Sequence, residues 1–305
     1  MRTARTRRRA NRRQGFTLIE ILTVIAIIGI LVGLLIPAIG AARRYVANSA
    51  IVFEVQTIGN AVEQYKQKFE DYPPDGSNRS IFERHFRKSF PNIAPTEFAI
   101  LYASANNHTG TAAGLSPNDT VMDAAEALVF CLGGFSDDPV HPFTGPGGPL
   151  SLVPGTSGNN AVYQYNVNRN KPMFEFKQEQ LSLLVDVNAN RTISVDEETL
   201  SGLDPSFNDL IPVYNPGRNL QAPFVYFDSR SYSFAYGSNV YFNSYQAPNL
   251  RGVARPYKSD DINTNVPGPT QSNDIQIRDT YVRYANDKSF QIVSAGLDDD
   301  YGGVP

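Results

Sequence analysis

The sequence predicts an α+β fold in which one long N-terminal helix packs against an antiparallel sheet with inserted loops. Three observations predict it. Residues 16–39 are almost all apolar, residues 40–70 carry apolar side chains at helical spacing, and the chain beyond residue 161 is rich in aromatic and β-branched runs. With 305 residues and 41% hydrophobic content, the chain can bury a sizeable core.

The charges of the chain are segregated. Of its 27 Lys and Arg, seven lie within residues 1–15, so the remaining 20 are outnumbered by 30 Asp and Glu. Phosphate binding needs a basic surface, and we therefore expect no nucleic-acid partner. The single cysteine, Cys131, excludes an internal disulfide.

Residues 16–39 are the predicted membrane span, because a helix of about 20 apolar residues crosses the hydrocarbon core. The arginines before it predict a cytoplasmic N-terminus, with the bulk of the chain on the other side. A secretory signal has its small-residue cleavage site after a shorter apolar run. Here the small residue Gly15 precedes the run, which predicts that residues 1–15 are a removable leader and that the helix is retained.

Glu20 is the one acid within this span. A carboxylate there costs about 2.5–3.5 kcal/mol and normally marks a partner. Cleavage after Gly15 would give Phe16 a charged amine one helical turn before Glu20. The acid could pair with its own amine or with that of a neighbouring subunit, and the alternative is that it only snorkels to the end of the span.

The run RRQGFTLIEILTVIAIIGILVGLLIP resembles the cleavage and methylation signature of type IV pilins and type II secretion pseudopilins. The resemblance implies a pilin-like fold, with prepilin peptidase cutting between Gly15 and Phe16 and methylating the new amine. It also implies that Glu20 is the assembly acid and that Pro37 kinks the helix. The expected setting is the bacterial inner membrane, as a single-pass protein that polymerises with pilins through an inner-membrane assembly platform.

Residues 40–70 are predicted to continue the helix as an amphipathic segment that ends near Asp71, before Pro73 and Pro74. The predicted apolar stripe consists of Ile51, Val55, Ile58, Val62, Tyr65 and Phe69. Residues 71–160 are predicted to form loops with short helices at 95–104 and 119–132, and an exposed loop at 145–158. The second helix would be capped by Asp119 or Thr120 and stopped at Gly133.

Residues 161–305 are predicted to form a β-rich globular region. The expected strands fall within residues 161–167, 181–187, 224–227, 232–236 and 290–294.

Calcium is the one candidate cofactor, with two candidate loops. In the first, oxygen-bearing side chains occupy positions one, three, five and twelve of a loop, as in an EF-hand: Asp186, Asn188, Asn190 and Glu197. Arg191 stands where a glycine normally permits the sharp turn, and no clear entering helix precedes the loop. A calcium site and a polar hairpin turn both remain open.

The second loop is the run SAGLDDDYGG at residues 294–303. It resembles the closing loop of major pseudopilins, which implies Asp298 and Asp300 as calcium ligands. The alternative is an acidic, solvated terminus.

The sequence contains no constellation typical of an enzyme. His85, His108 and His141 lack zinc-ligand spacing and are expected on the surface or in loops, and Cys131 falls inside a predicted helix. The predicted function is a non-catalytic structural subunit of a pilus-like filament, with the C-terminal loop favouring a type II secretion pseudopilin. The alternatives are a minor subunit at a filament tip and a membrane-anchored surface binding protein or hydrolase that uses the same anchor without polymerising.

Overall fold

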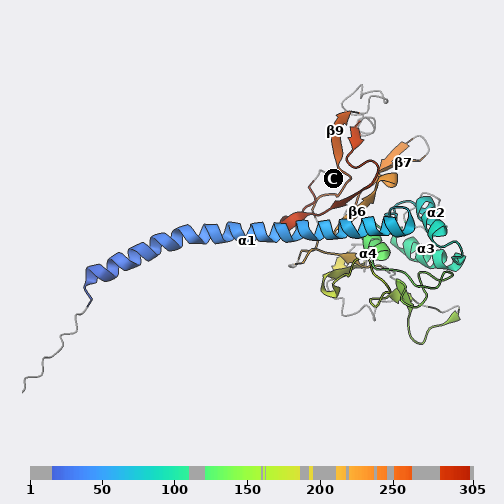
Figure 1. Cartoon of the computed structure of the whole chain (residues 1–305), viewed down its shortest axis with the longest axis horizontal. Coiled ribbons are helices and arrows are strands. Elements are labelled where there is room, and N and C mark those ends of the chain that lie inside the picture. Colours follow the sequence, from blue (N-terminus) through green and yellow to red (C-terminus); the bar gives the residue numbers. More distant parts are fainter. Residues whose placement is uncertain are drawn as a thin grey trace, which may run out of the picture. The chain divides into compact units, whose positions relative to one another are not determined.

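The computed structural model describes residues 16–109, 121–158, 161, 163–185, 192–194, 211–217, 220–236, 239–245, 251–262 and 282–302. The chain divides into two compact units, residues 1–49 and residues 50–305. Helix α1 (Leu18–Phe69) contributes to both units, and the other elements of Figure 1 belong to the second. Within the described residues, a long apolar helix and small antiparallel sheets give the predicted α+β fold.

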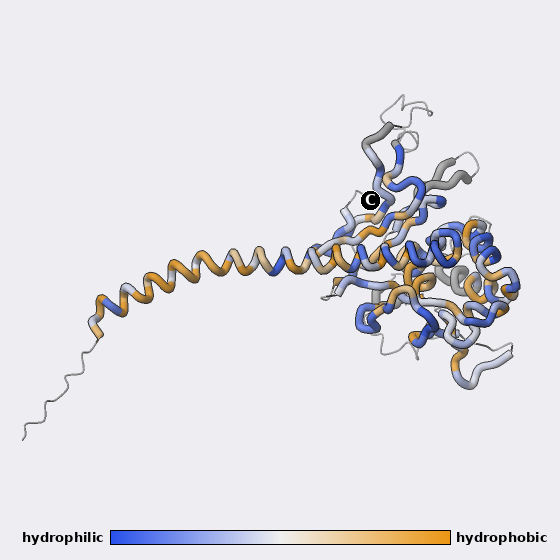
Figure 2. The backbone as a smooth tube through the Cα atoms, in the orientation of Figure 1, coloured by the Kyte–Doolittle hydropathy of each residue, from blue (hydrophilic) through white to orange (hydrophobic). Residues whose placement is uncertain are grey.

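The N-terminal part of α1 is hydrophobic along nearly its whole length (Figure 2). Its large side chains are exposed, among them Leu18 at 83% and Leu34 at 70%. In the described part of the chain, α1 is the one helix long and apolar enough to cross a membrane. The helix continues through Pro37, whose missing N–H leaves one carbonyl of the preceding turn without its helical donor. The kink at Pro37 stays a prediction.

The C-terminal part of α1 buries the predicted apolar stripe. Ile51, Ile58, Val62 and Tyr65 are at most 8% exposed, and Val55 and Phe69 pack against the same core. The helix ends at Phe69, two residues before the predicted end, and Glu70 adopts a left-handed φ of 59°. The chain then passes through the two prolines, which cannot continue a helix.

Helix α2 (Arg79–Ser89) was not predicted. It is capped by Asn78, whose side chain accepts a hydrogen bond from the N–H of Ile81, and it buries Phe82, His85 and Phe86 on one face. Helix α3 (Pro95–Thr109) begins where predicted and runs five residues further than the predicted 95–104.

Helix α4 (Glu126–Leu132) starts later than the predicted residue 119, and the proposed caps Asp119 and Thr120 lie outside the described residues. The Asp123 carboxylate accepts hydrogen bonds from the N–H groups of Ala125 and Glu126, and the Glu126 carboxylate accepts one from the N–H of Asp123. This reciprocal pair satisfies free donors in the first turn. All seven residues of α4 are buried, and the helix ends at Gly133 as predicted.

The strands pair into five small antiparallel sheets among the described residues, instead of one continuous sheet. The sheets are β1–β2, β4–β3–β5, β6–β11, β7–β8 and β9–β10. The strand bounds are β1 (Leu150–Leu152), β2 (Tyr163–Tyr165), β3 (Leu181–Val185), β4 (Thr192–Ser194), β5 (Val213–Tyr214), β6 (Val225–Asp228), β7 (Ser233–Tyr236), β8 (Asn239–Phe242), β9 (Lys258–Ile262), β10 (Val282–Tyr284) and β11 (Phe290–Val293).

Each of the five predicted strand segments contains part of a strand. The prediction of an exposed loop at 145–158 is wrong at β1, because Leu150 is buried and pairs with Tyr165.

Strand β6 lies between the two parts of the core. Tyr226 packs into the larger cluster, which holds α1, α2 and α4, whereas Val225 and Phe227 pack into a smaller cluster with Tyr232 and Tyr245. Alternate side chains of a strand point to opposite faces, so β6 is buried on both sides. It therefore joins the helical part of the second unit to the C-terminal sheets.

Candidate functional site

The start of α1 holds the predicted assembly acid. The Glu20 carboxylate accepts hydrogen bonds from the Thr17 N–H at 2.7 Å and from the Thr17 hydroxyl at 2.8 Å, and the Glu20 N–H donates to the same hydroxyl at 3.3 Å. This reciprocal arrangement is a capping box. It turns the carboxylate back toward Phe16, which is described and exposed, whereas Gly15 lies outside the described residues.

Thr17 was not predicted as a site residue. Its signal was present, because Thr followed three residues later by Glu before an apolar run is the sequence pattern of a capping box.

Glu54 fastens α1 to the sheet region of the second unit. One carboxylate oxygen accepts hydrogen bonds from the Tyr214 hydroxyl at 2.8 Å and from the Gln180 side-chain amide at 3.2 Å. Gln180 precedes β3 and Tyr214 closes β5, so a single acid on α1 holds two segments that are far apart in the sequence.

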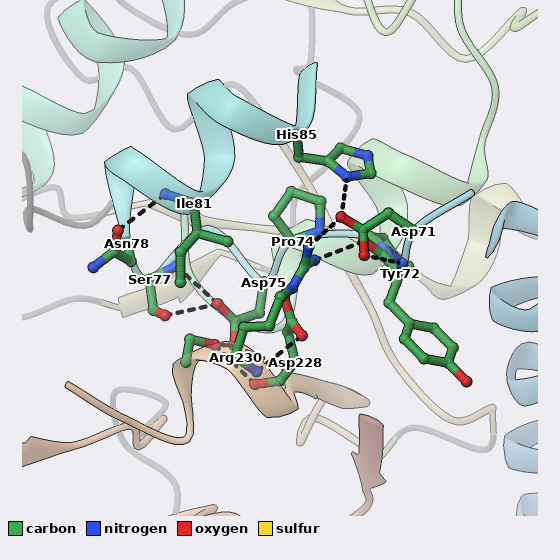
Figure 3. A network of polar contacts seen from close by, with 12 residues as sticks. Asp71, Tyr72, Pro74, Asp75, Ser77, Asn78, Ile81, His85, Asp228 and Arg230 are labelled. Carbon is green, nitrogen blue, oxygen red and sulfur yellow. Dashed lines mark hydrogen bonds and ion pairs between the residues drawn. The ribbon is translucent and has the colours of Figure 1, made fainter. Parts of the chain in front are cut away.

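A buried polar network joins the end of α1 to β6 and the turn after it (Figure 3). At its centre, the Asp75 carboxylate accepts hydrogen bonds from the N–H of Asp228, the hydroxyl of Ser231, the side-chain amide of Asn243, and both the N–H and the hydroxyl of Ser77. Burial raises the pKa of Asp75, and the hydrogen bonds from Ser231 and Ser77 act in the opposite direction.

Arg230 carries the charge pairing of this network. Its guanidinium pairs with Asp228 at 2.6 Å and with Asp71 at 2.5 Å, and it donates to the Tyr72 carbonyl at 2.8 Å. Burial raises the pKa of Asp228 to about 6, although Arg230 opposes the shift. Burial would also raise the pKa of Asp71, but His85 and Arg230 beside it lower that pKa to about 2. Arg230 thus links the segment that follows α1 to the end of β6.

The prediction that each histidine lies on the surface or in a loop is wrong for His85. It is 1% exposed within α2, with Nε2 2.7 Å from the Tyr65 hydroxyl and Nδ1 3.6 Å from an Asp71 oxygen. Burial lowers the pKa of His85 and raises the pKa of Tyr65. Tyr65 is fully buried as well, whereas the side chain of Asp71 is 32% exposed. The Tyr65–His85 contact joins α1 to α2.

The other two histidines and the cysteine lie in different surroundings. His141 lies in a loop, as predicted, 3.1 Å from Asp138. His108 falls within α3, and Cys131 is buried inside α4, as predicted.

Arg169 caps the C-terminal end of α4. Its guanidinium donates to the carbonyls of Val129 at 2.7 Å, Phe130 at 2.6 Å and Gly134 at 3.1 Å. A cation is favourable at a helix C-terminus, where free carbonyls and the helix dipole concentrate negative charge. Arg169 was not predicted, because it lies at least 35 residues from the carbonyls that it satisfies.

The acids of the C-terminal loop do not converge on one point. Asp298 closes the short 3₁₀ turn Gly296–Asp298, Asp299 binds the backbone near residue 221, and Asp300 accepts a hydrogen bond from the Gly302 N–H at 2.8 Å. In the described part of the chain, no group of three or more His, Cys, Asp or Glu side chains could hold a metal ion. Calcium also takes backbone carbonyls and waters as ligands, so calcium binding at Asp298 and Asp300 stays a prediction.

The first candidate calcium loop spans residues 186–197. Its four proposed ligands, Asp186, Asn188, Asn190 and Glu197, lie outside the described residues. Calcium binding there stays a prediction.

Comparisons with known proteins match the N-terminal segment of the chain to a known motif. Residues 10–36 match the family described as the prokaryotic N-terminal methylation motif. The type IV wide pilus major component PilA4 of Thermus thermophilus is 37% identical over 95 residues, which cover 31% of this chain and 69% of that protein. The type II secretion system core protein G of Escherichia coli is 33% identical over 66 residues, which cover 22% of this chain and 46% of that protein. No solved structure matches the chain.

These relatives are filament components or secretion-system proteins, and the match includes Phe16 and Glu20 at the start of the apolar helix. The motif and the helix together indicate a membrane anchor. The chain therefore belongs to the family of type IV pilins and type II secretion pseudopilins.

Proposed function

We propose that this chain is a non-catalytic structural subunit of a pilus-like filament, cut by prepilin peptidase after Gly15 and assembled through its N-terminal helix. The observation that carries the proposal is the position of the Glu20 carboxylate, which is held by Thr17, the residue next to Phe16. Cleavage would create an ammonium group at Phe16, one helical turn from this acid.

The proposed assembly step exchanges the partner of Glu20. In the single subunit the carboxylate is satisfied by the N–H and hydroxyl of Thr17. In the filament it would pair with the Phe16 ammonium of a neighbouring subunit. Opposite charges attract strongly where water is scarce, and a lone carboxylate in lipid is costly. The exchange would favour the packed state and fix the axial register of neighbouring helices.

The proposed setting is the bacterial inner membrane, with α1 as a single span. The seven arginines of residues 1–15 would hold the leader in the cytoplasm, where the peptidase cuts, and would leave residues 50–305 on the outer side. An inner-membrane platform would then extract the mature subunit and add it to the filament, beside further copies of this chain or other pilins.

Among filaments we favour a type II secretion pseudopilus. The similarity to core protein G and the resemblance of residues 294–303 to the pseudopilin closing loop support this assignment. An adhesive, motile or DNA-uptake pilus is the second candidate, and the similarity to PilA4, named as a pilus component, supports it.

The proposal is tested by immunogold electron microscopy of sheared filaments, using an antibody against residues 50–305, which we call the head. We expect gold along the filaments in the parent strain and none in a strain that lacks the type II secretion platform. Labelled filaments that persist without that platform would assign the chain to a pilus, and gold at tips alone would make it a minor subunit.

The rival function is a membrane-anchored binding protein or hydrolase that does not polymerise. One observation favours a binding role, namely a surface pocket of about 240 Å³ beside Arg169 that is lined by Tyr165, Phe174, Glu175 and Phe176, among others. Unlabelled filaments, with the protein confined to the membrane, would support this rival and contradict the filament proposal.

A further inference from the structure

We propose that the C-terminal loop is locked to the head by the Asp299 carboxylate bound to backbone N–H groups, and that this lock needs no cation. The loop lies between two segments that are distant in sequence, residues 221–223 and residues 251–253. It is held at both by hydrogen bonds within the chain. The inference goes beyond the role of the filament and does not depend on it.

The first anchor is Asp299 itself. One carboxylate oxygen accepts hydrogen bonds from the N–H groups of Gln221 and Ala222, both at 3.0 Å, and the other oxygen lies 3.2 Å from the Gln221 nitrogen. Hydrogen bonds to an ionised acceptor are stronger than neutral ones. Asp299 has a left-handed φ of 53°, a conformation that Asp and Asn adopt more readily than most residues.

The second anchor is a backbone contact. The Val253 N–H donates to the Gly302 carbonyl at 3.0 Å, and the Tyr301 N–H donates to the Arg251 carbonyl at 3.3 Å. Gly252 lies between these two bonds with a φ of 76°, and a Cβ atom there would lie 2.5 Å from the Gly302 carbonyl oxygen. The loop thus approaches the Gly252 backbone too closely for any side chain.

The Tyr301 side chain reinforces the first anchor. Its hydroxyl donates to the Pro223 carbonyl, and its ring packs edge-on against Tyr245 with the ring centres 6.1 Å apart. Residues 299–302 therefore tie the segment before β6 to the segment before β9.

The electrostatics of these anchors oppose a calcium ion. Backbone N–H groups present partial positive charge, so the position beside Gln221 and Ala222 attracts an anion and repels a cation. The Asp300 carboxylate likewise faces the Gly302 N–H. For Asp299, where both oxygens face N–H groups, calcium would have to compete with these donors. Asp298 lies in the preceding 3₁₀ turn, and its side chain has no hydrogen bond or ion pair with any described residue.

The test is hydrogen exchange with mass spectrometry on the full chain in detergent micelles, with either excess calcium chloride or excess EGTA. The peptide to follow contains the Gln221 and Ala222 amides. We expect equal protection of these amides in both conditions. Asp299→Asn keeps the shape and the backbone preference but removes the charge, and it should speed their exchange by about tenfold or more. The matched control Asp298→Asn should leave them unchanged.

Three results would overturn the proposal. The first is protection of the Gln221 and Ala222 amides that rises with calcium and falls in EGTA. The others are exchange of these amides in Asp298→Asn as fast as in Asp299→Asn, or no change of their exchange in Asp299→Asn. If Asp299→Asn does not fold, the wild-type comparison of calcium with EGTA still decides. Hydrogen exchange is measured peptide by peptide, so calcium binding at residues 186–197 would change the exchange of peptides from that loop and would be distinguished from binding at the C-terminal loop.

Discussion

Glu20→Ala is expected to remove the chain from sheared filaments while leaving it cleaved, membrane-inserted and folded. The variant cannot pair with a neighbouring Phe16 ammonium, which then lies unpaired in lipid at every subunit contact. Each loss of about 1.4 kcal/mol lowers an equilibrium constant tenfold. We expect the amount of chain in the filament fraction, measured by immunoblot, to fall by at least about tenfold.

Thr23→Ala is the matched control for Glu20→Ala. Thr23 lies in the same apolar helix, and its hydroxyl donates to the Ile19 carbonyl within the helix, so its loss removes a polar group without removing a charge. This control should assemble normally. Normal assembly of Glu20→Ala would mean that the acid has no part in polymerisation.

Arg230→Met is expected to lower the free energy of unfolding of the head by about 3–5 kcal/mol, the usual cost of breaking a buried ion pair. The substitution leaves the fully buried Asp228 without its cation, and Asp71 and the Tyr72 carbonyl lose a donor. Urea unfolding of the full chain in micelles, followed by tyrosine fluorescence, measures the change.

Lys171→Met is the control for Arg230→Met, because Lys171 and Asp137 form an ion pair whose side chains are 70% and 66% exposed. Exposed pairs contribute little to stability. Adding Asp228→Asn to Arg230→Met should restore part of the loss, since it removes the buried charge. Equal losses for Arg230→Met and Lys171→Met would refute the importance assigned to the network.

The long helix and its end could be predicted because their signals are local. The apolar run, the stripe at helical spacing and the prolines after Asp71 each act within a few residues. Helix α2 was missed although its signals are local as well. Asn78 is a typical N-cap residue, and Phe82, His85 and Phe86 recur at helical spacing. The burial of His85 was not predictable, because it depends on contacts with Tyr65 and Phe69 of α1.

The strand segments were predictable, but their pairing was not. Aromatic and β-branched runs indicate strands, yet β6 pairs with β11, more than 60 residues away, and not with β7, which follows it. β1 lies in a segment rich in Gly and Pro, and pairing with β2 buries its Leu150. Register depends on which faces become buried, and that is set by the whole fold.

The site residues also differ in whether a local sequence signal marks them. Phe16 and Glu20 belong to a short motif and were found from it. Asp75 binds Asp228 across 153 residues of sequence, and Arg230 binds Asp71 across 159. No spacing rule connects the members of either pair. At the C-terminus, resemblance selected Asp298 and Asp300, whereas Asp299 makes the long-range contact. That choice depends on the left-handed φ of Asp299 and on two amides 77 and 78 positions away.

The central claim is that proteolysis creates the ammonium partner of Glu20, and mass spectrometry of the N-terminal peptide from purified filaments tests it most directly. The account predicts that residues 1–15 are absent and that the chain begins with Phe16 bearing a methylated amine. Filament subunits that retain the arginine-rich leader, or that are cut beyond residue 39, would contradict it.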